Sequence, residues 1–191
     1  MLQKIILASG SPRRMQLLKQ IGIVFEVEIP QSDESIIVGE SPSELVMRLS
    51  KLKATEIANK LVTGIIIGSD TIVVLEGDVL GKPINKLDAI SMLKRLSNKT
   101  HKVFTGYSII DVVNKVTITN FNETEVKFRN LDENEIFQYV ESGSPLDKAG
   151  SYGIQDDFGA VFIEYIIGDY YTVVGLPISK LYLDLKKINA I

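Results

Sequence analysis

The sequence predicts an α/β protein built on a long mixed β-sheet with helices on its faces. Strand and helix patterns alternate along the chain, which is typical of parallel strands joined by crossover helices. Several neighbouring strand patterns are joined by short turns instead, which indicates antiparallel pairs in the same sheet. The chain has 191 residues, of which 45% are hydrophobic, and no polar linker or repeat divides it. We therefore expect a single domain over residues 1–191, with enough apolar material for a large core.

The N-terminal segment predicts a strand, a turn and a helix, followed by a second strand. Lys4–Ala8 is an apolar run typical of a short buried strand, and Ser9–Pro12 is rich in turn residues. Apolar residues at helical spacing predict a helix over Arg13–Ile21, which Gly22 ends. Val24–Ile29 alternates with acidic residues on one face, which predicts a half-exposed strand.

The next segment predicts a long helix and a buried strand. Ser41–Glu44 has the sequence SPSE, which supplies an N-cap serine, a proline in the first turn and an acidic residue near the helix start. We expect this helix to run to about Leu61. Ile65–Ile67 then predicts a buried strand that ends at the polar segment Gly68–Thr71.

The remainder of the chain predicts three more helices and several strands. In order, the expected elements are a hairpin of Ile72–Leu75 with Val79–Leu80, a helix over Lys86–Ser97, strands over Val103–Asp111 and Val116–Arg129, a helix over Asp132–Glu141, strands over Ala160–Tyr165 and Tyr170–Val173, and a helix over Pro177–Lys186. Ligands of open α/β sheets bind at strand ends. Polar clusters are expected at such ends over Ser9–Arg14, Ser69–Thr71, Lys82–Pro83, Thr105–Gly106 and Lys148–Gln155.

Composition excludes several classes of protein. The net charge is −3, which disfavours binding to polynucleotides, because phosphate backbones require a basic surface. The absence of cysteine excludes disulfides and thiolate zinc sites. No apolar run is long enough for a signal peptide or a membrane span, so we expect a cytoplasmic protein that does not act at a membrane. The single histidine, His101, is interpreted as a structural residue.

The segment Ser9–Arg14 is a candidate anion site. It follows a predicted strand and opens a predicted helix, where backbone N–H groups and the helix dipole attract anions. Arg13 and Arg14 add forked, permanently charged donors suited to phosphate. The GxxxxGK[ST] pattern of a P-loop is absent. The alternative interpretation is a solvated turn with two surface arginines.

Carboxylates and lysines elsewhere are weaker candidates when each is taken alone. Asp70 follows a predicted buried strand, where it can act as a general base or as a ligand of a magnesium ion that bridges phosphates. Glu34 lies in an acidic loop, and Glu40 is interpreted as a solvated residue of that loop. Lys53 and Lys82 can supply point charges to phosphate oxygens.

Taken together, these segments resemble the Maf family of nucleoside triphosphate pyrophosphatases. The resemblance covers essentially the whole chain, and the segments follow the family's order. They are LASGSPRR at residues 7–14, DE at 33–34, GSDT at 68–71, GKP at 81–83, HKVFTG at 101–106, PLDKAGSYGIQ at 145–155 and VGLP at 174–177.

The resemblance implies hydrolysis of free nucleoside triphosphates to the monophosphate and pyrophosphate, with Mg²⁺ or Mn²⁺ as cofactor. It also implies a fold similar to that of the inosine triphosphate pyrophosphatases. In that fold a single elongated mixed sheet is flanked by helices in a two-lobed protein, with the active-site cleft between the lobes. Homodimers are frequent among such proteins.

The resemblance also assigns site residues. Asp70 matches the family's proton acceptor and Glu34 its second essential carboxylate, and both are expected to hold the metal. Phosphate-side positions are matched by Ser9, Arg14, Lys53 and Lys82, and positions that separate the family's branches by base preference are matched by Arg13, Thr71 and Gln155. The chain departs from the family at Asp156–Asp157 and at Asn98, where glycine is usual; asparagine also tolerates a left-handed turn.

The amide of Gln155 favours a pyrimidine substrate. Uracil and thymine present an N–H donor flanked by carbonyl acceptors, and a glutamine side chain can both accept and donate. The resemblance of the 145–155 segment to the dTTP/UTP branch agrees, so dTTP and UTP are the expected substrates, and removal of modified nucleotides from the pool is a role that such an activity can serve. The alternatives are a pyrophosphatase for 7-methyl-GTP or inosine triphosphate, and a nucleotide-binding regulator of cell division.

Overall fold

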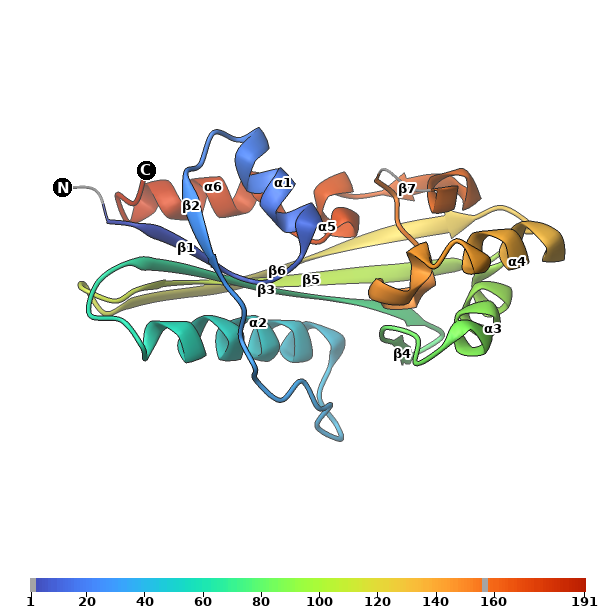
Figure 1. Cartoon of the computed structure of the whole chain (residues 1–191), viewed down its shortest axis with the longest axis horizontal. Helices are drawn as coiled ribbons and strands as arrows, with labels where there is room; N and C mark the ends of the chain where they lie inside the picture. The colour runs from blue at the N-terminus through green and yellow to red at the C-terminus, as the bar shows by residue number, and fades with distance from the viewer. Residues whose placement is uncertain (1–2, 156–157) are drawn as a thin grey trace. The chain divides into compact units, whose positions relative to one another are not determined.

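The strands of the protein form one mixed sheet. A computed structural model describes residues 3–155 and 158–191. Within them, seven strands lie in the order β2-β1-β3-β5-β6-β7, with β4 paired to β3 (Figure 1). The strands are β1 (Ile5–Ala8), β2 (Phe25–Glu28), β3 (Ile65–Leu75), β4 (Asp78–Leu80), β5 (Thr100–Asp111), β6 (Val116–Phe128) and β7 (Ile163–Ile167). Strand β1 is parallel to β2 and β3, whereas β4 and β7 are antiparallel to their neighbours, which confirms the predicted mixed α/β sheet.

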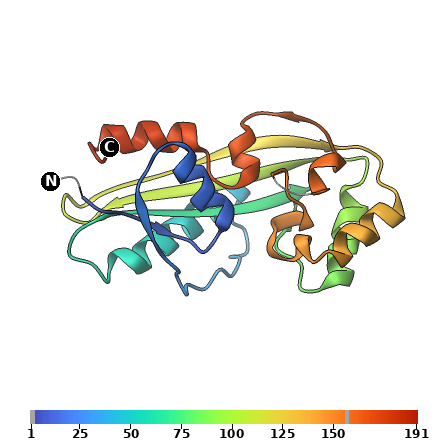
Figure 2. The same cartoon turned by 45° about the horizontal axis from the view of Figure 1, so that its top comes forward.

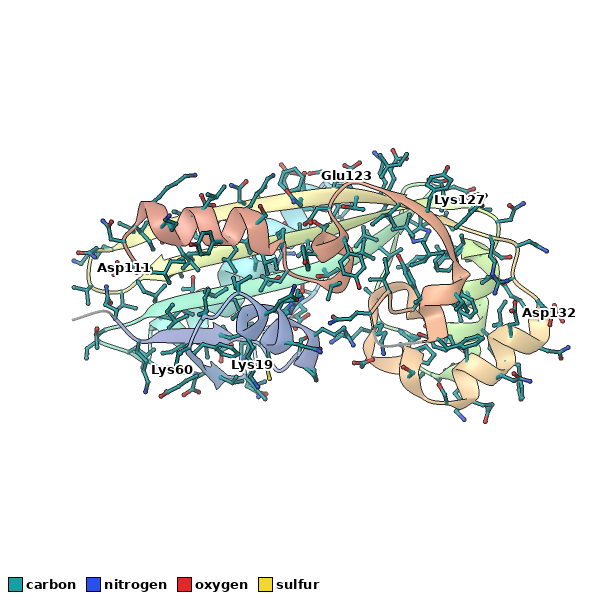
Figure 3. All side chains as sticks on the ribbon, turned by 90° about the horizontal axis from the view of Figure 1, so that it is seen from above. Lys19, Lys60, Asp111, Glu123, Lys127 and Asp132 are labelled. Carbon is teal, nitrogen blue, oxygen red and sulfur yellow. The ribbon has the colours of Figure 1, made fainter. Side chains whose placement is uncertain are left out.

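Several helices begin at side-chain caps that the sequence supplies. The helices are α1 (Pro12–Gln20), α2 (Pro42–Ala58), α3 (Lys86–Leu96), α4 (Glu133–Glu141), α5 (Tyr170–Val174) and α6 (Ile178–Lys187), with short 3₁₀ segments η1 (Ser144–Asp147), η2 (Ala149–Ser151) and η3 (Phe158–Phe162). Ser41 and Glu44 form a reciprocal capping box at the start of α2, as the SPSE sequence predicted. Asp132, labelled in Figure 3, caps α4 in the same way. Within the described residues, no helix is both long and apolar enough to cross a membrane.

The chain forms two compact units. Unit 1 comprises Met1–Asp70, Thr105–Asn122 and Gly175–Ile191, and unit 2 comprises Thr71–Phe104 and Glu123–Val174. The boundaries between the units fall inside β3, β5 and β6. A single domain over residues 1–191, with a cleft between two lobes, therefore stays a prediction.

In unit 1, helix α2 packs very closely on the sheet. It covers one face of the strands, and α1 and α6 cover the other (Figure 1). A Cβ atom on Gly68 of β3 would lie 2.2 Å from the Ser50 carbonyl oxygen, and one on Gly106 of β5 would lie 2.3 Å from that of Val46. Only glycine permits this approach of helix backbone to strand backbone. The two glycines thus set the depth at which α2, and every side chain on it, meets β3.

Unit 2 has an aromatic core. Phe128, Tyr152 and Phe162 are buried and pack edge to face. Helices α3 and α4 lie side by side over this core (Figure 2). His101 is buried among the same rings, and its Nε2 atom lies 2.8 Å from the Tyr152 hydroxyl oxygen. Burial lowers the pKa of His101 to about 4, so the ring is neutral at pH 7.

Strand β3 differs from its prediction, because it runs without a break from Ile65 to Leu75. Gly68–Thr71 is therefore the middle of a buried strand and not its end. The sequence suggested an end because Ser69 and Asp70 are polar. In the structure both polar groups are compensated, since the Ser69 hydroxyl donates to two backbone carbonyls and Asp70 pairs with Lys53. Thr105–Gly106 likewise lies inside β5, and Lys148–Gln155 follows η1 and not a strand.

The C-terminal prediction was wrong for one element and shifted for another. Tyr170–Val173 is β-branched and aromatic, which predicted a strand, yet it forms helix α5. The Asp169 carboxylate accepts hydrogen bonds from the backbone N–H groups of Tyr171 and Thr172, which caps the helix and overrides strand propensity. The strand expected at Ala160–Tyr165 begins at Ile163. Asn98 has φ +57°, in agreement with its expected tolerance of a left-handed turn.

Candidate active site

The junction of β1 and α1 holds an arginine in a fixed position. Ser9 is buried, and its hydroxyl oxygen accepts hydrogen bonds from the Ser11 backbone N–H at 3.2 Å and from Arg14 Nη1 at 3.1 Å. Arg14 Nε donates to the Gly175 carbonyl oxygen at 2.9 Å. Burial lowers the pKa of Arg14, whereas the carboxylates of Asp70 and Glu34 act to raise it. Arg14 therefore lies within electrostatic reach of both acids.

Those acids share one ammonium group. Lys53 Nζ lies 2.6 Å from Asp70 Oδ1 and 3.0 Å from Glu34 Oε2. The side chains of Lys53 and Asp70 are each 9% exposed, whereas that of Glu34 is 52% exposed. A buried ion pair of this kind costs desolvation energy, and removing one partner leaves an uncompensated charge. Such an arrangement is more typical of a functional site than of a stabilising contact.

Segments far apart in the chain meet at one backbone carbonyl. Gly175 O accepts the hydrogen bond from Arg14 Nε and a second one, at 3.1 Å, from the Ser69 hydroxyl. Ser69 also donates to Gly106 O at 2.8 Å. Gly175 has φ +119°, a conformation that L residues rarely adopt. The VGLP segment thus fixes both the arginine and the strand that carries Asp70.

Besides the Glu34–Lys53 pair, the loop that carries Glu34 contacts helix α2 at two further places. Glu56 Oε2 accepts hydrogen bonds from the Gln31 backbone N–H at 2.8 Å and from the Ser32 hydroxyl at 2.6 Å. Arg48 pairs with both carboxylate oxygens of Glu40, at 2.5 and 2.8 Å. The interpretation of Glu40 as a solvated residue was wrong, because its side chain is 12% exposed and binds Arg48 through a bidentate contact.

A family model described as "Maf-like protein" matches residues 4–188 of the chain. The chain belongs to the Maf family. It is 50% identical over 188 residues to a protein of Bacillus anthracis named dTTP/UTP pyrophosphatase, with 98% of this chain and 97% of the relative covered. A protein of the same name from Bacillus cereus (strain ATCC 10987 / NRS 248) is also 50% identical, over 98% of this chain and 91% of its own length.

A solved structure is also similar to this Maf chain. It is the Staphylococcus aureus Ham1 protein, with a TM-score of 0.46 and 16% identity over 66% of this chain and 72% of that one. The sheet order and the strand directions of the Maf chain define its α/β fold by themselves.

Unit 1 of this Maf protein brings together five of the residues that the sequence predicted for the site. They are Ser9, Arg14, Glu34, Lys53 and Asp70. Arg13 neighbours them on α1, and its charge contributes to the lowered pKa of Arg14.

The other predicted residues of the Maf protein belong to unit 2. Thr71 follows Asp70 on β3, so its side chain points to the opposite face of the strand. Lys82 is exposed in the segment after β4. Gln155 Oε1 is buried and has no hydrogen-bond partner among the described residues. The departure at Asp156–Asp157 lies outside the described residues.

Two residues of the site were missed by sequence reasoning. Arg48 and Glu56 lie about two helical turns apart on α2, and each binds the loop that carries Glu34. The sequence hinted at these contacts only by an acidic loop followed by a helix with basic residues. Charged residues of this kind are common on solvated surfaces, so the pattern alone does not predict a contact.

The carboxylates of this Maf site fit a divalent cation. The described residues contain no cluster of three or more His, Cys, Asp or Glu side chains suited to a metal. Asp70 and Glu34 nevertheless lie close together, since both contact the same ammonium. Mg²⁺ is commonly bound by one or two carboxylates, with water and substrate phosphates as its other ligands. Two neighbouring oxygen ligands therefore suffice for an ion that arrives with a nucleotide.

Proposed function

We propose that the protein hydrolyses dTTP and UTP to the nucleoside monophosphate and pyrophosphate. One observation carries the proposal. Asp70 and Glu34 converge on Lys53 beside Arg14, in a chain that is 50% identical to proteins named dTTP/UTP pyrophosphatase. Acids placed next to strong phosphate-binding cations are what hydrolysis of a phosphoanhydride requires.

The cationic side chains of the site are proposed to bind the triphosphate. Arg14 presents a planar guanidinium held by Ser9 and Gly175, which limits its motion before substrate binds. Lys53 donates a hydrogen bond to Asp70 and forms an ion pair with Glu34, and an ammonium group has a third donor for a phosphate oxygen. We assign Ser9 and Lys82 to the same phosphate-binding role.

Asp70 is the proposed proton acceptor. Water attacks the α-phosphorus, a new P–O bond forms, the α–β anhydride bond breaks, and pyrophosphate leaves. The proton lost by the attacking water passes to an Asp70 carboxylate oxygen, while Glu34 helps to orient that water. Asp70 is suited to this because β3 and α2 fix it from two sides, which lowers the entropic cost of alignment.

Asp70 and Glu34 would also hold the divalent cation, Mg²⁺ or Mn²⁺, since both ions prefer oxygen ligands. The bound ion supplies neutralisation of charge on the phosphate oxygens. Arg14 and Lys53 contribute to the same neutralisation from the protein side.

Gln155 is the proposed reader of the base, with Arg13 and Thr71 as further specificity residues. The buried Gln155 Oε1 is an acceptor without a donor among the described residues, and such a group costs free energy until it is paired. The N3–H group of thymine or uracil is a donor that can pair with it. The N1–H of inosine or of 7-methylguanine is also a donor, so the preference for pyrimidines is proposed from the names of the relatives and not from this acceptor alone.

Pyrophosphate release from a nucleotide panel tests the proposal. We expect turnover of dTTP and UTP in Mg²⁺ or Mn²⁺, loss of activity in EDTA, and little turnover of ITP and 7-methyl-GTP. Preference for ITP or 7-methyl-GTP would assign a different substrate. Binding without turnover would indicate a nucleotide-binding regulator. Release of orthophosphate would contradict the chemistry.

We further propose that the enzyme acts on free nucleotides in the cytoplasm and forms a homodimer. Fractionation of cells and light scattering of the purified protein test these two points.

A further inference from the structure

The loop between β2 and α2 holds Glu34 with little support from packing. Glu34 is half exposed, and its carboxylate reaches the shared ammonium of Lys53. Ile36, Ile37 and Val38 follow it in the chain and are 58%, 54% and 100% exposed, so they do not anchor the loop in a core. A residue in an unpacked loop samples many positions unless polar contacts hold it. The position of Glu34 therefore depends on the polar contacts of its neighbours.

Helix α2 supplies those contacts on both sides of Glu34. Before it, Glu56 accepts hydrogen bonds from Gln31 and Ser32. The hydrogen bonds from Ser32, Lys60 and Gln31 lower the pKa of Glu56 to about 2. After it, Arg48 Nη2 donates to the Ser35 carbonyl oxygen at 3.0 Å, and Arg48 also holds Glu40.

The two anchors leave Glu34 little freedom. The anchored atoms lie two residues before Glu34, at Ser32, and one residue after it, at Ser35. Both anchors come from the helix that carries Lys53, and Lys53 lies between Arg48 and Glu56 in sequence. One rigid element thus fixes the ammonium and the carboxylate that meets it.

We infer that Arg48 and Glu56 are positioning residues that clamp the loop on α2 and hold Glu34 against Lys53 and Asp70. We call the contacts of Arg48 with Ser35 and Glu40, and of Glu56 with Gln31 and Ser32, the α2 clamp. The inference rests on the proposed pyrophosphatase activity, because it assigns these residues a role in that reaction. Neither residue contacts substrate in this scheme, and each acts through Glu34.

Loss of the clamp should impair turnover more than substrate binding. A misplacement of about 1 Å at a catalytic group can lower the rate by about 10²-fold. The contacts of Arg14 with Ser9 and Gly175, and that of Lys53 with Asp70, involve neither clamp residue, so these two cations should still bind the triphosphate when the clamp is removed. We therefore expect Arg48→Met and Glu56→Ala to lower kcat by about 10- to 100-fold, with KM for dTTP changed by less than about 3-fold.

Matched controls exist on the same carboxylate. Lys60, labelled in Figure 3, pairs with the other oxygen of Glu56 at 3.0 Å and does not contact the loop in any bond of the described structure. Lys60→Met should leave kcat unchanged. Glu56→Gln retains a carbonyl oxygen that can accept from Gln31 and Ser32, so it should keep most of the activity that Glu56→Ala loses.

A double-mutant cycle separates positioning from general damage. If Arg48 acts through Glu34, then adding Arg48→Met to Glu34→Gln should lower kcat by less than about 2-fold further, because the group to be positioned is already altered. Full additivity of the two losses would overturn the inference. Arg48→Lys, which keeps the charge but not the bidentate contact, should give an intermediate loss.

Hydrogen exchange provides a readout that does not depend on activity. Backbone amides of residues 31–40 should exchange faster in Arg48→Met and Glu56→Ala than in wild type or Lys60→Met, while the amides of β3 stay protected. Unchanged exchange in the loop would overturn the clamp. Absence of pyrophosphate release by the wild type would refute the proposed function and leave this exchange test valid. An active wild type with variants of unchanged kcat would refute the clamp alone.

Discussion

Units 1 and 2 share the strands β3, β5 and β6, yet the buried positions on these strands differ in charge. In unit 1 the strands bury the carboxylates of Asp70 and Asp111, and α2 buries the ammonium of Lys53. In unit 2 the polar ring buried on β5 is His101, which stays neutral among Phe128 and Tyr152. Buried charge is costly unless it is paired, whereas a neutral imidazole needs only a hydrogen-bond partner.

This difference fits the proposed location of the chemistry in unit 1. Charged groups are retained in unit 1 although an apolar interior would be more favourable for stability, which fits a site under functional demand. The aromatic interior of unit 2 holds its one histidine by packing and by a hydrogen bond to Tyr152. Changes to the buried charges Asp70 and Lys53 of unit 1 should therefore alter turnover, whereas a change to His101 of unit 2 should alter stability.

Asp70→Asn should give the largest effect. The amide keeps the size of the side chain but loses its charge and basicity, so kcat should fall by roughly 10²- to 10⁴-fold. Circular dichroism should stay near that of the wild type, whereas the melting temperature should fall, because Lys53 loses one partner of its buried ion pair. Pyrophosphate release from dTTP measures the loss. Near-wild-type turnover would remove Asp70 from the mechanism and break the contrast between the units.

His101 should make stability depend on pH. Burial lowers its pKa to about 4 in the folded protein, against an ordinary value of 6.5, so the unfolded chain binds the proton first as pH falls. The contribution to stability is complete above pH 6.5, declines as pH falls, and is fully lost below about pH 4, a change on the order of 3 kcal/mol. Denaturant unfolding from about pH 7 to about pH 4 measures the decline.

The variant His101→Gln separates the contribution of the His101 ring to pH-dependent stability from the contribution of the Asp and Glu side chains. Its unfolding free energy should fall less steeply between pH 6.5 and about pH 4 than that of the wild type, while dTTP turnover at pH 7 stays similar. Parallel curves for the two proteins would show that the ring does not titrate differently in the two states.

Gly68→Ala should weaken unit 1 by displacing α2. The added Cβ would lie 2.2 Å from the Ser50 carbonyl oxygen, so helix and strand must separate. Overpacking of this kind costs roughly 1–3 kcal/mol, and kcat should fall as well because Lys53 moves with the helix. Gly81→Ala is the control for stability, since nothing lies within 4 Å of its new Cβ. Equal melting temperatures for the two variants would argue against close helix packing as the basis of the site.

Gln155→Glu tests whether unit 2 supplies base selectivity. The change removes a donor and places an anion against the O4 carbonyl of uracil or thymine. The decrease in kcat/KM for dTTP and UTP should correspond to a loss of roughly 1–3 kcal/mol in transition-state stabilisation. The decrease should be smaller for 7-methyl-GTP, which presents donors at its base edge. Steady-state kinetics with the three nucleotides measures this. Equal losses for all three would mean that Gln155 only supports its segment.

Much of this protein can be predicted from local signals in its sequence. The caps at Ser41 and Asp132 depend on residues three apart, and the apolar periodicity of the helices is likewise local. The site residues of unit 1 lie in short motifs that can be recognised without knowing their contacts. The order of those motifs was enough to indicate the Maf family, which the family match confirms.

What the tertiary structure decided depends on contacts between distant residues. Asp70 lies inside a continuous strand because Lys53, 17 residues away, neutralises it. The Ser69 hydroxyl is satisfied by Gly175, 106 residues away. The conformational preference of a short segment does not depend on partners so far away in the sequence. A polar segment after an apolar run is therefore predicted to be the end of a strand. For the same reason the clamp of Arg48 and Glu56 on the Glu34 loop emerged only once α2 was placed against that loop.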